Sequence, residues 1–263
     1  MLTVNSISKT FFPGTVNERR ALDRLDLTLA EGDFVTVIGS NGAGKSTLLN
    51  AVAGRLPVDS GVIEIDGVNV NRMPDYKRAK YVGRVFQDPL AGTAPNLTIE
   101  ENLSLALLRG KRRGLRPGLD KKRRARFTED LAMLELGLED RLTAKVGLLS
   151  GGQRQALSLL MAGFTQPRIM LLDEHTAALD PQRAELVTTI TERIVREGGL
   201  TTLMVTHNME QAIRLGNRLI MMHEGRIVYE SDAATKSKLT VQDLLKEFAN
   251  IKGATLSDKA FLG

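Results

Sequence analysis

The sequence contains no cysteine and no tryptophan, and aromatic residues make up only 4% of its 263 residues. The absence of cysteine excludes disulfide bonds, thiolate metal sites and cysteine nucleophiles, and it fits a reducing cytosol. No apolar run approaches the roughly 18 residues that a membrane-spanning helix needs. The first residues lack the pattern of a secretory signal peptide, so we expect the chain to stay in the compartment where it is made.

The net charge of +5 is concentrated in one segment. Residues 110–126 contain nine Lys and Arg against the single acidic residue Asp120, whereas the rest of the chain has 27 basic and 30 acidic residues. Such a run fits attraction to an anionic membrane surface or to an acidic partner loop. It also fits a solvated helix face, which is the more usual role of a charge run.

The clearest motif is a Gly-rich loop between the apolar run 34–38 and the helix-forming run 48–53. It has the P-loop pattern, in which glycines let the backbone fold tightly and direct its N–H groups toward phosphate oxygens. Lys45 is expected to reach the β- and γ-phosphates, and the Ser46 hydroxyl to bind Mg²⁺. The predicted phosphate-binding residues are Gly39, Ser40, Asn41, Gly42, Ala43, Gly44, Lys45, Ser46 and Thr47.

Alternating or continuous apolar runs predict β-strands on both sides of a central helical region. Between about residues 97 and 164 the spacing becomes helical, which indicates an inserted helical subdomain. A capping pattern at Thr98–Glu101 begins this region, and leucines at 131–138 predict a helix within it. The predicted strands are 2–8, 22–29, 34–38, 62–67 (ending in an Asp-Gly turn), 81–86, 169–174, 200–206, 218–222 and 226–229.

Polar residues with catalytic chemistry follow several of these strands. Ligands bind beyond the carboxyl ends of parallel strands, so Asp173 is expected to hold the Mg²⁺ sphere and Glu174 to polarise an attacking water. His207 follows the strand 200–206; a lone histidine is more often structural, but this position favours contact with the γ-phosphate. Gln87 follows another strand, where a glutamine fits either a water or Mg²⁺ ligand role or a plain strand end.

Two further helix starts are predicted at Ser150 and at Asp180. Ser150 suits an N-cap, and we expect exposed Gly151 and Gly152 to leave N–H groups open to an anion at the positive end of the helix dipole. A plain capped helix accounts for Ser150 but not for the two glycines, which cost helix stability. Asp180 followed by Pro181 begins the next helix, and capping alone accounts for this aspartate.

Phe11 and Phe12 are expected in a loop after the first strand, where they are poorly covered. An aromatic face at this place suits stacking against a flat base, which a phosphate-binding loop cannot recognise. A phenylalanine that fills the edge of the core is an equally good interpretation for either residue.

Taken together, these motifs resemble those of the ATP-binding cassette (ABC) ATPases, over essentially the whole chain and in the family's order. The resemblance implies an α/β P-loop NTPase fold with a mostly parallel sheet, an antiparallel β portion and an inserted α-helical subdomain. It implies one cassette whose catalytic core is 1–96 and 165–238, with a helical subdomain at 97–164 and a C-terminal helix and tail at 239–263.

The resemblance also assigns a role to each motif. Gly39–Thr47 is the Walker A motif, and Leu149–Gln153, with Ser150, Gly151, Gly152 and Gln153, is the nucleotide-contacting signature motif. The remaining assignments are Gln87 as the Q-loop glutamine, Asp173 as the end of Walker B, Glu174 as the catalytic glutamate, Asp180 as the D-loop aspartate, His207 as the switch histidine and Phe11 as the adenine-stacking aromatic.

ATP and Mg²⁺ are therefore the expected cofactors, and the family works as a head-to-tail pair. The residues suggest the same, because one chain has two phosphate-binding helix starts but only one lysine-bearing loop. Each ATP is expected between the P-loop of one copy and residues 150–152 of the other, in a two-fold symmetric dimer. Hydrolysis then removes the bridging charge and lets the two copies separate.

The resemblance favours the ATP-hydrolysing subunit of a membrane transporter, bound through permease subunits to the cytoplasmic face of the inner membrane. An extracytoplasmic substrate-binding protein is a further expected partner, and nucleic acid is not. Residues 88–101 fit a permease-contacting segment or an ordinary connection. The alternatives are an ABC exporter ATPase and a non-transport ABC ATPase such as an iron–sulfur assembly scaffold.

Two positions depart from the family pattern. His175 stands where most relatives have proline, and Ala177 stands where many have serine. The string 173–180, together with residues 11–15, resembles a subgroup of bacterial importers that includes tryptophan and tyrosine transporters. Import is preferred on this likeness, and an amino acid is the expected kind of cargo.

Overall fold

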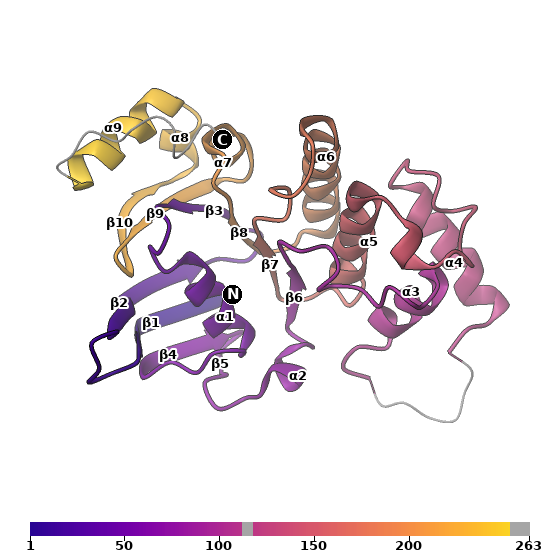
Figure 1. Cartoon of the computed structure of the whole chain (residues 1–263), viewed down its shortest axis with the longest axis horizontal. Coiled ribbons are helices and arrows are strands. Elements are labelled where there is room, and N and C mark those ends of the chain that lie inside the picture. The colour runs from indigo at the N-terminus through magenta and orange to yellow at the C-terminus, as the bar shows by residue number, and fades with distance from the viewer. Residues whose placement is uncertain (112–117, 253–263) are drawn as a thin grey trace. The chain divides into compact units, whose positions relative to one another are not determined.

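The computed structural model describes residues 1–111 and 118–252 of the chain. These residues form two compact units: Met1–Arg78 together with the chain from Thr201 onward, and Ala79–Leu200. Both units contain strands and helices (Figure 1).

The first unit contains an antiparallel sheet in the order β2-β1-β4-β5. Along β2, buried and exposed residues alternate through most of the strand, which creates one apolar face. Asp66 and Gly67 both have positive φ, as a tight two-residue hairpin turn between β4 and β5 requires. The strands are β1 (Leu2–Phe11), β2 (Arg19–Leu29), β4 (Ser60–Ile65) and β5 (Val68–Asn69).

A second set of strands in this unit is mostly parallel. β3 lies between β8 and β9 and is parallel to both, whereas β10 is antiparallel to β9. Every residue of β3 and β8 is buried, because parallel strands are covered on both faces. The carboxyl ends of β3 and β8 therefore lie at the same edge. These strands are β3 (Phe34–Gly39), β8 (Thr202–Val205), β9 (Arg218–His223) and β10 (Arg226–Ser231).

Helices of the first unit contribute to its core. Leu244 and Phe248 of α9 are fully buried in a cluster with Met209 and Ala212 of α7 and with side chains of β3 and β9. Burying these apolar side chains holds the C-terminal helix on the unit. The helices are α1 (Lys45–Ala53), α2 (Asp75–Arg78), α7 (Met209–Arg214), α8 (Ala233–Lys236) and α9 (Val241–Lys252).

In its described residues, the second unit combines a parallel strand pair with four α-helices. β6 (Val82–Val85) pairs with β7 (Ile169–Asp173) from Val82–Ile169 to Val85–Leu172. Thr98 caps the first helix in a capping box with Glu101, as its sequence predicts. The helices are α3 (Ile99–Leu107), α4 (Lys121–Ala132), α5 (Gly151–Gly163) and α6 (Pro181–Gly198), with a 3₁₀ turn at Val146–Leu148.

The α/β class, the parallel and antiparallel strands and the helical insertion confirm the expected fold. Two local predictions were wrong. The first strand continues to Phe11 instead of ending near Ser8, because β2 continues to pair with it as far as Arg19. The helix predicted at 131–138 ends at Ala132, and Leu134 and Leu138 are instead buried in the following turns.

The basic segment 110–126 is partly engaged in ion pairs. Residues 112–117 lie outside the described part of the chain, whereas Lys121–Arg126 begin α4. Arg124 binds the buried carboxylate of Glu100 through two hydrogen bonds of 2.6 and 2.9 Å, which raises the pKa of the guanidinium. Arg126 pairs with Asp130 at 3.3 Å. The described end of the segment thus joins α4 to α3 through Arg124 and adds one ion pair within α4.

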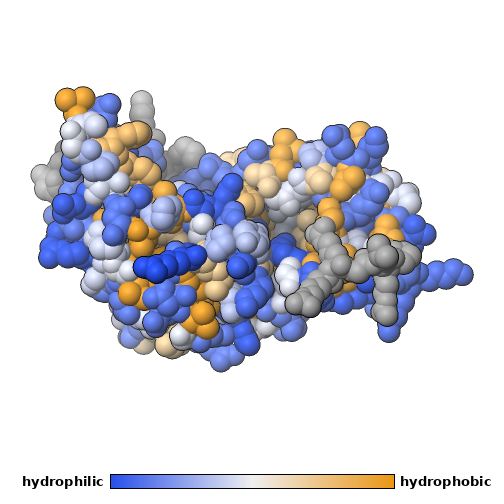
Figure 2. All heavy atoms as spheres, turned by 90° about the horizontal axis from the view of Figure 1, so that it is seen from below, coloured by the Kyte–Doolittle hydropathy of each residue, from blue (hydrophilic) through white to orange (hydrophobic). Residues whose placement is uncertain are grey.

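Apolar side chains on the visible face in Figure 2 are interspersed with hydrophilic ones and do not form one broad patch. Within residues 1–111 and 118–252, no helix has both the length and the apolar character that crossing a membrane requires.

Candidate functional site

The P-loop connects the buried end of β3 to the N-terminus of α1. Gly44 has φ 100°, and a Cβ there would overlap the Ala21 carbonyl oxygen, so only glycine fits. Gly42 has φ 80° and faces the Arg19 guanidinium, which donates a hydrogen bond of 2.8 Å to its carbonyl oxygen. The loop therefore holds its backbone in a conformation that leaves N–H groups at the start of α1 for an anion.

Lys45 is the cation of this loop, and it is buried at 7% exposure. Its Nζ donates hydrogen bonds to the carbonyl oxygens of Gly39 (2.6 Å) and Ser40 (3.2 Å). A buried ammonium needs such acceptors, and phosphate oxygens are stronger ones than neutral carbonyls. The chemistry of the loop therefore fits a polyphosphate.

A hollow of about 930 Å³ opens beside the P-loop within the first unit. Its size lies in the range of small-molecule sites. His207, which follows β8 and is exposed, lines the same hollow as Gly39 and Gly42. The remaining lining residues are Glu18, Arg19, Arg20, Asp23, Ser40, Asn41, Ala43, His223 and Glu224.

The hairpin turn between β9 and β10 supports the P-loop. Gly225 donates a hydrogen bond of 3.0 Å to the Ala43 carbonyl oxygen and accepts one of 3.1 Å from the Asp23 N–H. The Arg226 guanidinium binds the Asp23 carboxylate at 2.5 and 2.8 Å and holds the pKa of this carboxyl below its usual value. These long-range contacts carry no local sequence signal, so the sequence did not reveal them.

Phe11, the expected adenine-stacking residue, is half-buried in β1 opposite Arg19 of β2. It is absent from the lining of the hollow, although its cross-strand neighbour Arg19 touches Gly42. Phe12 is 66% exposed, with φ 50°. Phe11 therefore lies next to Arg19, which lines the hollow, without lining it itself. Its stacking role stays a prediction.

The acidic pair Asp173 and Glu174, at the carboxyl end of β7, belongs to the second unit. Asp173 is the last residue of the strand, and its carboxylate accepts a hydrogen bond of 3.0 Å from Arg84 of β6. Glu174 has φ 43°, a left-handed conformation that is uncommon for a residue other than glycine. The strand thus ends directly before Glu174, where the backbone bends, as the sequence predicts.

His175 is a buried residue that sequence reasoning did not connect to any partner. Its exposure is 1%, and its Nε2 lies 2.9 Å from the Thr191 hydroxyl of α6. The hydroxyl donates to the Val187 carbonyl oxygen at 2.7 Å, so the histidine Nε2–H is the donor toward Thr191. Burial lowers the pKa of His175 to about 4, and the neutral ring therefore anchors the residue after Glu174 to α6.

The signature segment begins α5 as predicted. Ser150 caps the helix and forms a capping box with Gln153, whose side chain accepts from the Ser150 N–H at 3.1 Å. The expectation of two exposed glycines was wrong for Gly152, which is buried. A Cβ on Gly152 would meet Arg183 at 3.4 Å, and one on Gly151 would meet Leu179 at 3.2 Å. Gly151 and Gly152 thus lie close to Leu179 and Arg183 at the start of α6, although neither contact is too short for a side chain at that position.

Two further predicted residues lie in the same unit. Asp180 is exposed and caps α6 by accepting from the Arg183 N–H at 3.1 Å, so its capping role is confirmed. Gln87 is exposed after β6. The preceding residue, Phe86, accepts a hydrogen bond of 3.0 Å at its carbonyl oxygen from the Gln155 side chain of α5. This contact connects α5 to the end of β6, next to Gln87.

The predicted Mg²⁺ ligands have suitable chemistry. Ser46 is exposed in the first turn of α1, and Asp173 provides a carboxylate. Mg²⁺ is commonly held by few protein oxygens together with substrate phosphates and water. In the described part of the chain, no three His, Cys, Asp or Glu side chains form a group that could hold a metal ion.

Comparisons with known proteins agree with this set of motifs. The family model for ABC transporters matches residues 22–177. The chain is 45% identical over 249 residues to the tyrosine transport ATP-binding protein of Clostridioides difficile (strain R20291), which covers 94% of this chain and 98% of that protein. It is 34% identical over 226 residues to the spermidine/putrescine import ATP-binding protein PotA of Thermobifida fusca (strain YX), covering 86% of this chain and 56% of that protein.

A solved structure is also similar. The ATP-binding cassette MJ0796, in a dimeric post-hydrolysis state bound to ADP and Pi, matches with a TM-score of 0.76 and 32% identity. The match covers 89% of this chain and 99% of that chain.

Proposed function

This chain belongs to the ABC transporter family as an ATP-hydrolysing, ATP-binding subunit, and from this premise we propose that it powers the import of an aromatic amino acid. The observation that carries the proposal is a complete P-loop with a buried Lys45, in a chain 45% identical over nearly its whole length to a tyrosine transport subunit. The polyamine-import relative is less similar, at 34% identity.

The P-loop would bind the triphosphate. N–H groups at the start of α1 would donate hydrogen bonds to phosphate oxygens. The Lys45 ammonium would donate to phosphate oxygens in place of the Gly39 and Ser40 carbonyl oxygens. Ser46, Asp173 and Gln87 would hold Mg²⁺, which supplies charge neutralisation at the β- and γ-phosphates. Thr47 and residues 39–44 complete the backbone cradle, and Phe11 would cover the base.

Glu174 would accept a proton from the attacking water. A general base is effective when its position is determined by rigid surroundings, and the His175–Thr191 hydrogen bond holds the next residue on α6. His207 would contact the γ-phosphate, since it lines the same hollow as the P-loop. Asp180, which caps α6, would act at the boundary with the second copy.

Two copies would form the working unit. One chain offers a single lysine-bearing loop and a separate helix start at Ser150–Gln153, so a head-to-tail pair would complete two equal sites. The dimeric state of the similar cassette supports this arrangement. Permease subunits would hold the pair at the cytoplasmic face of the membrane, and an extracytoplasmic substrate-binding protein would be a further partner. The division into core 1–96 with 165–238, helical subdomain 97–164 and C-terminal part 239–263 belongs to the same proposal.

Replacing Glu174 by Gln tests the catalytic assignment. The variant is expected to bind ATP normally and to lose turnover by about 10²-fold or more, because a positioned base contributes about that much. Glu185→Gln, on the exposed side of α6, is the matched control and should retain turnover. Equal turnover in Glu174→Gln and the wild type would remove Glu174 from this role.

The cargo requires a separate measurement. ATP turnover of the chain assembled with its permease in liposomes should rise when the binding protein carries tyrosine or tryptophan, and not when it carries putrescine. Stimulation by putrescine alone would contradict the aromatic amino acid while leaving the ATPase assignment intact.

A further inference from the structure

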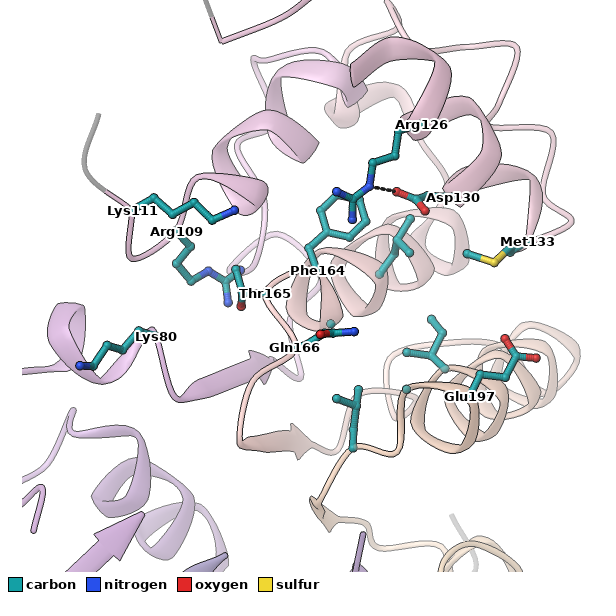
Figure 3. Close-up of a pocket in the computed structure, with 15 residues that line it drawn as sticks. Lys80, Arg109, Lys111, Arg126, Asp130, Met133, Phe164, Thr165, Gln166 and Glu197 are labelled. Atoms are coloured by element: carbon teal, nitrogen blue, oxygen red, sulfur yellow. Dashed lines mark ion pairs between the residues drawn. The ribbon is translucent and has the colours of Figure 1, made fainter. Parts of the chain in front are cut away.

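A second pocket, of about 710 Å³, lies entirely within the unit Ala79–Leu200 (Figure 3). None of the residues assigned to ATP or Mg²⁺ lines it. Its walls come from the end of α3, from α4, from the turn after α5 and from the end of α6. The side chains that carry the argument are Arg109, Lys111, Arg126, Phe164, Thr165 and Glu197.

In the part of the chain that the structure describes, two cations on one wall of the pocket have no acidic partner. Among the described residues, no ion pair joins Arg109 or Lys111 to a carboxylate. The Arg109 guanidinium is partly buried, donates a hydrogen bond of 3.3 Å to the Met161 carbonyl oxygen, and has its pKa lowered by burial. A partly buried cation without a counter-ion is costly, and an anion in the pocket would offset that cost.

An aromatic ring, Phe164, lines the pocket with one face stacked on the buried Phe127 at a centroid distance of 6.0 Å, and the next residue carries an unsatisfied hydroxyl. Phe164 is only partly buried, and the Arg126 guanidinium lies 5.7 Å from its ring centroid. Within the described part of the chain, the buried Thr165 Oγ1 has no hydrogen-bond partner. Buried hydroxyls are rarely left unsatisfied, so this hydroxyl is free to donate to a ligand once the Thr165 side chain turns toward the pocket.

The opposite wall carries the other sign of charge. In Figure 3, Arg109 and Lys111 lie on one side of the Phe164 ring, and Asp130, Met133 and Glu197 lie on the other. Asp130 is paired with Arg126 at 3.3 Å, and Glu197 is exposed. A ligand that is anionic throughout would be repelled by this wall, whereas hydroxyl or amino groups could donate to it. The asymmetry argues against an anionic membrane surface as the occupant.

We propose that this pocket binds a nucleoside phosphate as a second, non-catalytic site. The phosphate lies against Arg109 and Lys111 and accepts a hydrogen bond from the Thr165 hydroxyl. The base or sugar lies against the Phe164 ring, with its donors toward Glu197. A pocket of this volume is large enough for a ligand of that size. The site is independent of the proposed transport cargo.

AMP is the probe, and the full chain with Lys45→Ala is the background that weakens the P-loop site. Isothermal titration calorimetry is expected to show saturable binding of one AMP per chain. Lys111→Ala should weaken AMP binding by about tenfold, as expected for loss of one charge-assisted hydrogen bond. Lys121→Ala removes the same charge from an exposed position outside the pocket and should change the affinity by less than about twofold.

Two further variants separate recognition from folding. Thr165→Val should weaken AMP binding by about fivefold without lowering the melting temperature, because it removes a hydroxyl that is unsatisfied in the ligand-free chain. Phe164→Leu should weaken AMP binding but leave the binding of inorganic pyrophosphate unchanged, since only AMP has a ring to stack.

Either of two results would overturn the proposal. One is the absence of saturable AMP binding up to about 1 mM, a concentration that corresponds to a very weak complex. The other is AMP binding that Lys111→Ala and Thr165→Val leave unchanged. ATP turnover by the chain with an intact Lys45 is measured in parallel, so that failure of this site is distinguishable from failure of the ATPase assignment.

Discussion

Arg84 donates a hydrogen bond of 3.0 Å to the carboxylate of Asp173, and the two side chains are only 10% and 13% exposed. The pair joins β6 to β7 at the edge where Glu174 follows. Asp173 is thus charge-compensated within its own unit, by an arginine that also lies over the Phe86 ring at 4.7 Å. The carboxylate assigned to Mg²⁺ is therefore held in a defined orientation by Arg84.

We expect Arg84→Leu to lower the free energy of unfolding by about 2–4 kcal/mol, because it leaves a nearly buried carboxylate without its partner. Urea unfolding of the full chain measures the change. In the double variant Arg84→Leu/Asp173→Leu, most of that loss should be recovered, since neither charge is then buried alone. If the loss in the double variant equals the sum of the losses in Arg84→Leu and in Asp173→Leu alone, the pair contributes no specific stabilisation.

Thr191→Val tests the anchoring of His175. The variant removes the hydroxyl that accepts from the buried Nε2–H, and we expect a loss of about 1–3 kcal/mol in the free energy of unfolding. Thr189→Val is the matched control on the same helix, because the Thr189 side chain is exposed and donates only to its own turn, at the Glu185 carbonyl oxygen. If both variants unfold at the same urea concentration, the His175 hydrogen bond has no stabilising role.

The buried Lys236 is expected to make the free energy of unfolding of the chain depend on pH. Its Nζ is buried beneath α8 and donates to the Thr36 hydroxyl at 3.0 Å and to the Arg218 and Leu215 carbonyl oxygens. Burial lowers the pKa of Lys236 from 10.5 to about 7. Above pH 7 the unfolded chain therefore binds a proton that the folded chain does not, and stability rises with pH by up to about 1.4 kcal/mol per unit.

Urea unfolding between pH 7 and about pH 9 measures this slope in the wild type. The slope should be reduced in Lys236→Met and retained in Lys238→Met, which changes an exposed lysine two residues further along. A wild type whose stability falls over this range, or two variants with equal slopes, would contradict the assignment.

Gly151→Asp tests the pairing of two chains. The glycine is partly exposed at the first turn of α5, and a Cβ there would meet only the flexible Leu179 side chain at 3.2 Å. The fold is therefore expected to survive, whereas a carboxylate at this helix start would repel the phosphates of a nucleotide held by the other copy. We expect ATP binding by the single chain to persist and ATP-dependent dimerisation to be lost.

Size-exclusion chromatography with ATP, in a background that contains Glu174→Gln, measures this effect. Gly151→Ala adds the Cβ without the charge and should still dimerise. Loss of nucleotide binding together with dimerisation in Gly151→Asp would indicate misfolding and would remove the support for a composite site.

Much of the candidate site was predictable because its signals are local. The P-loop requires glycines at positive φ, and Ser150, Thr98 and Asp180 cap helices through atoms only a few residues away. The extent of the first strand and the end of α4 were not predictable in the same way. Pairing of Phe11 with Arg19 extends the strand, and burial of Leu134 and Leu138 in turns imitates a helical pattern.

The sequence by itself determined the α/β fold class, the phosphate-binding loop and the positions of the helix starts, because short-range backbone geometry and capping decide these features. Only the tertiary structure decided that Arg84 holds Asp173, that His175 is anchored to Thr191, and that Gly152 is buried against Arg183. Each of these contacts joins residues far apart in the chain, and their geometry depends on how the strands and helices pack together.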